Sequence, residues 1–128
     1  MPKMFRRFLA NDPRLFTGIG TREQNRIRVD GSRTGTILYG PYMLLFPAHY
    51  EARMKFDPAV MPKGSATLDI SVDTGRKVLA ARTLDAKQLQ EEGMSASLKF
   101  SGGDVMRRTE IRLICGSEFV AAVQSVEI

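Results

Sequence analysis

Alternation of apolar and charged residues is the clearest signal in this sequence. From residue 50 to residue 57 the chain places Tyr50, Ala52, Met54 and Phe56 at every second position, with charged residues between them. A period of two is typical of a β-strand that has one face buried and the other in water. The pattern therefore predicts a strand whose aromatic and aliphatic side chains, including Tyr50, point into a core.

The same alternation recurs along most of the chain, between turns rich in glycine, proline and aspartate. The sequence Asp-Thr-Gly-Arg from Asp73 to Arg76 is a signal for a tight hairpin. In the last segment the apolar parity changes between Val123 and Val126, which indicates a β-bulge. Further strands are predicted at residues 26–30, 66–73, 77–83, 94–100, 107–115 and 119–128.

One short helix is expected among these strands. Asp85 is a typical N-cap residue, Gln88 stands at the third helical position, and Gly93 follows the last turn. This spacing predicts a capping box and a helical segment over residues 85–92. With about eight short strands and one helix, the chain is predicted to be all-β, an antiparallel two-sheet β-sandwich of the jelly-roll type.

A Gly-Pro pair at Gly40-Pro41, with a tyrosine on each side, interrupts this pattern. Glycine adopts backbone angles that are closed to other residues, and proline has a fixed φ and no N–H donor. We therefore expect the strand ladder to break between the two tyrosines and the chain to turn a corner there. A second break is predicted around Pro47, which would place His49 in a loop.

The basic residues are unevenly distributed along the 128 residues, a length that suits one domain. Residues 1–33 hold eight lysines and arginines against three acidic residues, and the remaining residues hold eleven of each. The whole net charge of +5 is therefore N-terminal. Since Asn11-Asp12-Pro13 also breaks any helix there, we expect a basic segment at residues 1–24 that the fold does not require, and a sandwich domain at residues 25–128.

The sequence also indicates which partners the chain binds and where in the cell it is found. Residues 3–9 place apolar side chains at helical spacing around Arg6 and Arg7, so packing on a protein domain is the favoured interpretation and contact with an anionic membrane surface is the alternative. Neither a long apolar run nor the apolar centre of a signal peptide occurs, so we expect a soluble cytoplasmic protein. Mixed charges on the predicted sheet, such as Glu51 beside Arg53, argue against a nucleic-acid partner.

Few residues are suited to catalysis or metal binding. Cys115 is the single cysteine and has inward parity, which predicts a buried, inert thiol. One histidine and one cysteine supply neither a nucleophile–base arrangement nor a zinc ligand set. Asp69 and Asp73 share a strand face and are interpreted as solvated charges rather than an acid/base pair. We therefore expect no enzymatic activity, metal or cofactor. A structural calcium ion is unsupported, because no loop has the Asp-rich spacing of a calcium site.

The order of the predicted elements resembles a known family. Gly40-Pro41-Tyr42, the strand that begins at Tyr50, the strand ATLDISVD with its Thr-Gly turn, and the final strands containing TEIRLIC and AAVQSVEI are similar to the galactose-binding-domain-like jelly roll of many carbohydrate-binding modules. The likeness covers about residues 25–128. Within that family, the chain is most similar to accessory domains of bacterial surface-polysaccharide glycosyltransferases, except that His49 stands where their pattern has glycine.

The resemblance implies a lectin-like, non-catalytic module that binds a bacterial cell-surface or related glycan. Sugar sites combine an aromatic platform for a pyranose ring with planar polar groups that reach its hydroxyls. On this basis Tyr39, Tyr42, His49 and Arg53 are the predicted ligand-binding residues, with Tyr42 as the platform, although a buried corner role for Tyr42 stays open. The alternative function is a protein-interaction or dimerisation domain of a polysaccharide-biosynthesis assembly, with a second copy or a glycosyltransferase as partner.

Overall fold

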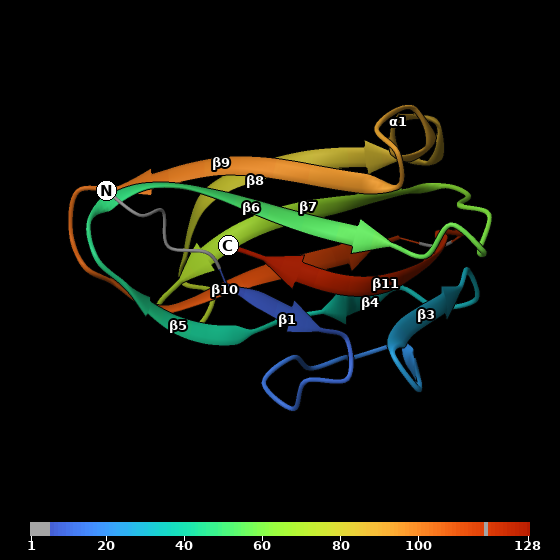
Figure 1. The fold of residues 1–128 in the computed structure, drawn as a ribbon, viewed down its shortest axis with the longest axis horizontal. Helices are drawn as coiled ribbons and strands as arrows, with labels where there is room; N and C mark the ends of the chain where they lie inside the picture. Colours follow the sequence, from blue (N-terminus) through green and yellow to red (C-terminus); the bar gives the residue numbers. More distant parts are fainter. Residues whose placement is uncertain (1–5, 117) are drawn as a thin grey trace.

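The structure, a computed structural model, describes residues 6–116 and 118–128 as a two-sheet antiparallel sandwich with one short helix (Figure 1). The predicted all-β fold class is confirmed. The elements are β1 (Arg7–Leu9), β2 (Thr21–Glu23), β3 (Arg26–Asp30), β4 (Gly35–Leu38), β5 (Pro41–Leu45), β6 (Ala48–Phe56), β7 (Ser65–Val72), β8 (Lys77–Asp85), α1 (Ala86–Glu91), β9 (Ser95–Gly102), β10 (Met106–Cys115) and β11 (Val120–Glu127).

Each sheet is built around one long strand near the end of the chain. In the first, which we call the β10 sheet, β10 pairs with β7 on one edge and with β4 and then β5 along the other, and β8 lies beyond β7. In the second, the β11 sheet, β11 pairs with β6 on one edge and with β3 and β1 on the other. β9 lies beside β6, and β2 lies beside β3.

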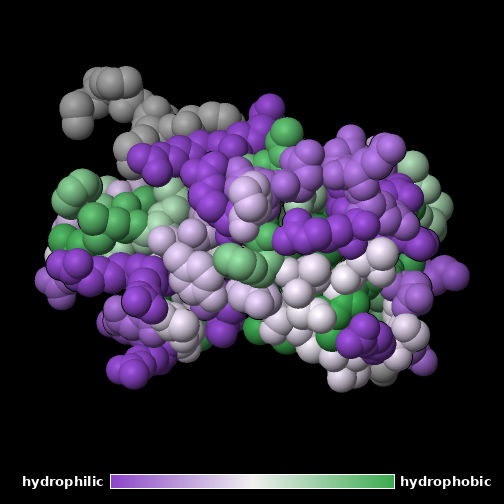
Figure 2. Space-filling model, turned by 90° about the horizontal axis from the view of Figure 1, so that it is seen from below, coloured by the Kyte–Doolittle hydropathy of each residue, from purple (hydrophilic) through white to green (hydrophobic). Residues whose placement is uncertain are grey.

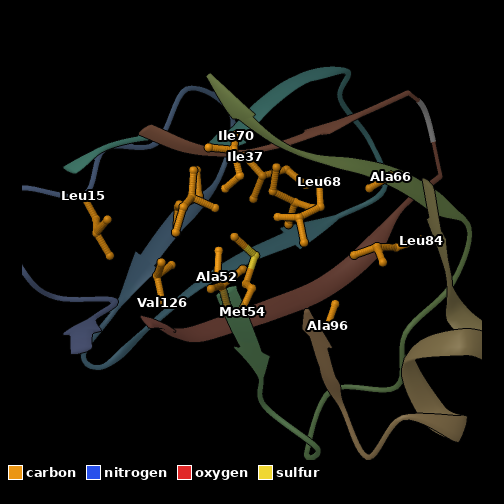
Figure 3. Packing of buried hydrophobic residues seen from close by; sticks show 14 of the residues in the cluster. Leu15, Ile37, Ala52, Met54, Ala66, Leu68, Ile70, Leu84, Ala96 and Val126 are labelled. Atoms are coloured by element: carbon orange, nitrogen blue, oxygen red, sulfur yellow. The ribbon is translucent and has the colours of Figure 1, made fainter. Parts of the chain in front are cut away.

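The core fills the space between the two sheets. Leu68 and Ile70 of β7 face Met54 of β6 and Val126 of β11, and all four side chains are buried (Figure 3). Burying one such side chain contributes about 1.5–3 kcal/mol. The alternation at residues 50–57 is thereby confirmed, and Tyr50 packs partly buried against the same cluster.

The predicted helix is confirmed with its cap. The Asp85 carboxylate accepts a hydrogen bond from the backbone N–H of Gln88 at 2.8 Å, and the Gln88 side chain accepts one from the backbone N–H of Asp85 at 3.1 Å. Leu89 anchors the helix in the core with no exposed area. Gly93 follows with a φ of 72°, the left-handed conformation that ends many helices.

Two smaller predictions from parity are also confirmed. The pairing of β11 with β6 shifts register between Val123 and Ser125, so that Val123 and Val126 both point inward. Cys115 is buried, and burial raises the pKa of its thiol. A thiol with a raised pKa forms little of the reactive thiolate.

Residues 6–24 pack against the sandwich, although the sequence predicts a division at residue 25. β1 pairs with β11 from Arg7 opposite Glu127 to Leu9 opposite Ser125. Phe8 keeps 3% of its surface exposed and Leu15 none. The buried apolar side chains tie this segment to the core, while its charged side chains stay at the surface. A basic segment can therefore still be part of the fold.

The helical spacing at residues 3–9 does not produce a helical turn where the structure describes it, and Phe8 packs on the domain itself, as the favoured interpretation predicted. Arg7–Leu9 form the extended strand β1, and residues 1–5 lie outside the described residues. A strand alternates its side chains, so Phe8 is buried while Leu9 is exposed. Among the described residues, no helix has the length and apolar character needed to cross a membrane.

Candidate functional site

The break at Gly40 is confirmed, but the chain does not turn a corner there. β4 ends at Leu38 and β5 begins at Pro41, and both run along the same edge of β10. The Gly40 carbonyl still accepts a hydrogen bond from the Ile111 N–H at 2.8 Å. Gly40 has a φ of 117°, and a Cβ added there would lie 2.4 Å from the carbonyl oxygen of Arg14. The glycine therefore lets the N-terminal segment close against the strand.

Tyr42 is the extra residue of a β-bulge just after this break. β10 places Thr109 opposite Met43 and Glu110 opposite Pro41, so no residue of β10 stands opposite Tyr42. Its φ is 64°, a left-handed conformation that costs a residue with a side chain roughly 1–2 kcal/mol. Such strain persists where the surroundings impose it, and it is enriched at ligand sites.

Three aromatic side chains gather at this bulge. Phe16 exchanges two backbone hydrogen bonds with Tyr39, at 2.8 and 3.0 Å. Its ring stacks on that of Tyr39 with centroids 5.4 Å apart at an angle of 21°, and lies 6.1 Å from that of Tyr42 at 58°. Phe16 is 40% exposed and both tyrosines are half-buried. We call Phe16, Tyr39 and Tyr42 the aromatic shelf.

A group of polar side chains lies next to the shelf on the outer face of the β10 sheet. Glu110 and Arg112 alternate along β10 with core residues, so they point outward. Arg112 donates two hydrogen bonds to Asp69 on β7, from Nε to Oδ1 at 2.8 Å and from Nη2 to Oδ2 at 2.7 Å. Ser71 Oγ donates to Glu110 Oε1 at 3.2 Å. Asp69, Ser71 and Glu110 are all buried, which is unusual for an outer face.

The hairpin turn between β7 and β8 contributes to this burial. A Cβ added at Gly75 would lie 3.1 Å from Nη1 of Arg112 and 3.7 Å from Oε1 of Glu110, so the turn passes close to both side chains. Tyr42 approaches from the other side. Burial raises the pKa of the Tyr42 phenol, and the charge of Glu110 and a hydrogen bond with it raise this pKa further. The hydrogen bond to Asp69 raises the pKa of Arg112.

The shelf and these polar groups together form a small recognition surface. An apolar ring face is available at Phe16 and the tyrosines, and hydrogen-bonding groups stand at its edge in Tyr42 and Arg112, supported by the buried Glu110 carboxylate. The bidentate pair with Asp69 fixes the plane of the guanidinium before any ligand arrives. The arrangement suits a neutral ligand with one apolar face and several hydroxyl groups.

The structure brings together only two of the four predicted binding residues. Tyr39 and Tyr42 belong to the shelf, whereas His49 and Arg53 point outward from β6 on the opposite sheet. His49 lies opposite Ser101 within the strand ladder rather than in a loop. The Arg53 guanidinium pairs with a glutamate of its own strand, Nη2 to Oε1 of Glu51 at 3.1 Å.

Sequence reasoning missed Phe16, Glu110 and Arg112. Phe16 joins the shelf only because the N-terminal segment folds back on Gly40, and no local pattern signals that contact. The outward parity of Glu110 and Arg112 was available from the alternation at residues 107–115. Their pairing with β7 was not, so Asp69 was wrongly interpreted as a solvated charge, although only 5% of it is exposed.

Within residues 6–116 and 118–128, no three His, Cys, Asp or Glu side chains are grouped so as to hold a metal ion. Comparison of the chain with protein-family models, with curated proteins and with solved structures finds no match.

Proposed function

We propose that this chain is a non-catalytic carbohydrate-binding module and that the aromatic shelf is its glycan site. The observation that carries the proposal is the position of Phe16, Tyr39 and Tyr42 beside the buried Glu110 and the Arg112–Asp69 pair. One face of a pyranose ring is apolar and stacks on an aromatic ring, while its equatorial hydroxyls bond to carboxylate and guanidinium groups.

The strain at Tyr42 supports this assignment. A tyrosine with a φ of 64° gains nothing from that conformation locally, whereas the bulge holds its ring beside Phe16 and its hydroxyl beside Glu110. The order of the predicted elements over residues 25–128 resembles accessory domains of bacterial surface-polysaccharide glycosyltransferases, and on that resemblance we propose a bacterial cell-surface glycan as the ligand. In this proposal His49 and Arg53 take no part in binding.

A glycan array with the purified chain, followed by calorimetric titration of the best ligand, tests the proposal. Tyr42→Ala should weaken binding by about ten- to a hundredfold, since a stacked aromatic contributes roughly 1–3 kcal/mol. Glu110→Gln keeps the shape and removes the charge, so it should weaken binding without a large change in the melting temperature. His49→Ala and Arg53→Ala, on the opposite face, should bind like the wild type.

The reverse pattern would refute the site. If His49→Ala or Arg53→Ala weakens binding and Tyr42→Ala does not, the glycan lies on the β11 sheet. If no glycan binds at millimolar concentration, where a shallow site of roughly 4 kcal/mol is still detected, the carbohydrate function itself is wrong.

A further inference from the structure

A second surface, separate from the aromatic shelf, lies at the end of the sandwich where β5 passes into β6 and β9 into β10. Three large apolar side chains are exposed there: Leu44 by 52%, Phe46 by 65% and Val105 by 39%. We call them the apolar tip. Figure 2 shows hydrophobic surface gathered at the left end of the molecule, which in Figure 1 is the end with these two connections.

Basic residues stand directly beside the apolar tip. β5 and β10 pair with Leu45 opposite Met106 and Met43 opposite Thr109. Two residues of β10, Arg107 and Arg108, therefore face the single residue Leu44 across the ladder, and Arg108 has the left-handed φ of 48°. This second bulge pushes the two arginines outward, and both are exposed.

The hairpin between β7 and β8 adds two more cations at the same end. The Asp73 N–H donates to the Arg107 carbonyl at 2.9 Å, which places Arg76 of the turn and Lys77 at the start of β8 close by, and both are exposed. Among the described residues, none of Arg76, Lys77, Arg107 and Arg108 forms an ion pair.

The rest of the sandwich neutralises many of its arginines. Arg26 pairs with Asp57 at 2.9 Å, and Arg112 pairs with Asp69 at 2.7 Å. In the β7–β8 turn and the two connections that carry the apolar tip, the acidic residues are Asp73 and Asp104, fewer than the four cations. This end therefore combines positive charges that form no ion pair with exposed apolar side chains in the two connections and near the end of β5.

We propose that this end of the sandwich docks on an anionic lipid surface. Phe46, Leu44 and Val105 enter the boundary between headgroups and acyl chains, and the four cations lie against the phosphates. Stable attachment to a bilayer needs two signals, and apolar insertion with a basic cluster supplies both. Phe46 and Val105 stand in the two connections and Leu44 near the end of β5, so the apolar side chains protrude at one end of the sandwich, which suits insertion into lipid.

Co-sedimentation of the full chain with vesicles tests this. The probe is vesicles of phosphatidylcholine and phosphatidylglycerol in roughly a two-to-one ratio, with pure phosphatidylcholine vesicles as reference. The chain should bind the mixed vesicles at least tenfold more strongly. Phe46→Ser with Val105→Ser, and separately Arg107→Gln with Arg108→Gln, should each weaken that binding at least tenfold. These side chains are exposed, so the melting temperature should hardly change.

Met61 and Lys63 provide matched controls at the opposite end, in the connection from β6 to β7 (Figure 1). Met61 is 63% exposed, and Lys63 is exposed as well. Met61→Ser and Lys63→Gln should leave vesicle binding unchanged. The proposal is overturned if the chain does not bind anionic vesicles, or if the serine variants bind them as well as the wild type does. It is also overturned if the control variants lose as much vesicle binding as the tip variants. Sedimentation equilibrium that shows the serine variants turning a dimer into a monomer would also overturn it, since a second copy would then cover the tip.

Discussion

At the scale of single residues, Tyr42 has a strained backbone conformation and also contributes its ring and hydroxyl to the candidate site. The bulge leaves it without a partner on β10, and its φ of 64° is disfavoured for any residue with a side chain. In return its ring completes the aromatic shelf and its hydroxyl meets Glu110. A residue that costs stability and organises a surface is typical of a binding position.

The raised pKa of Tyr42 predicts how stability depends on pH. Because the folded state holds the phenol proton more tightly, this contribution is complete below the ordinary tyrosine pKa of about 10. Above that pH the unfolded chain releases the proton first, so stability falls as pH rises through the folded pKa. Tyr42→Phe should lose less stability over that range. Urea denaturation at a series of alkaline pH values measures this, and equal pH slopes in both proteins would contradict it.

Gly40 is the glycine at which an added side chain would meet the closest contact. Gly40→Ala would place a Cβ 2.4 Å from the Arg14 carbonyl oxygen at a φ of 117°, and should destabilise the fold by more than about 2 kcal/mol. Gly103→Ala is the control, because nothing lies within 4 Å of its added Cβ. It should change stability by less than about 0.5 kcal/mol in urea denaturation. Equal effects would mean that the contact with Arg14 is not essential.

The sequence could predict residues whose behaviour is set by neighbours along the chain. The break at Gly40-Pro41 follows from backbone chemistry, and the burial of Cys115 follows from strand parity. The shelf could not be predicted in this way. Phe16 meets Tyr39 through a long-range bridge, and the strain of Tyr42 appears only once β5 is paired with β10.

At the scale of elements, the helix is the part whose sequence signal and structure agree most fully. Asp85→Ala removes the side-chain acceptor for the Gln88 N–H, and should cost about 0.5–2 kcal/mol. Lys87→Ala is a fitting control, because Lys87 is exposed and its ion pair with Glu91 is long, at 4.0 Å. It should be nearly neutral, since such pairs contribute a few tenths of a kcal/mol. Thermal melting of both variants checks the difference.

Strand length decided which elements could be predicted. The long strands β6, β7 and β10 contain enough residues to display a period of two, and the predicted segments coincide with them closely. β1 and β2 have three residues each, too few for a period to be recognised. They are held by neighbouring strands and by Arg22, whose guanidinium donates to the carbonyls of Ala10 and Leu15.

At the scale of the whole molecule, the two sheets repeat one construction. β10 and β11 each pair with one long strand on one edge and with two short strands, one after the other, on the opposite edge. On β10 the gap between the short strands holds Tyr39 and Gly40, and the aromatic shelf forms around it, with Tyr42 from β5 and Phe16 from the N-terminal segment. The short strand β1 completes the equivalent edge of β11, so the N-terminal segment supports the core and, through Phe16, also the shelf.

This construction predicts that the chain unfolds as one unit that includes β1. Phe8 is 3% exposed and lies opposite Val126, so Phe8→Ala should remove about 3–5 kcal/mol, a large fraction of the 5–15 kcal/mol typical of a domain. Leu9→Ala, at the next position of the same strand, truncates a side chain that is 52% exposed, and should cost less than about 1 kcal/mol.

The measurement is urea denaturation followed both by circular dichroism, which reports the sheets, and by tyrosine fluorescence, which includes the shelf. In Phe8→Ala both signals should move together to a lower midpoint, because loss of packing under β11 weakens one shared core. If the midpoint stays where it is, or if the two signals separate, residues 6–24 are an accessory to the sandwich after all. In that case the charge asymmetry of the sequence, rather than the pairing of β1, would mark the true boundary of the folding unit.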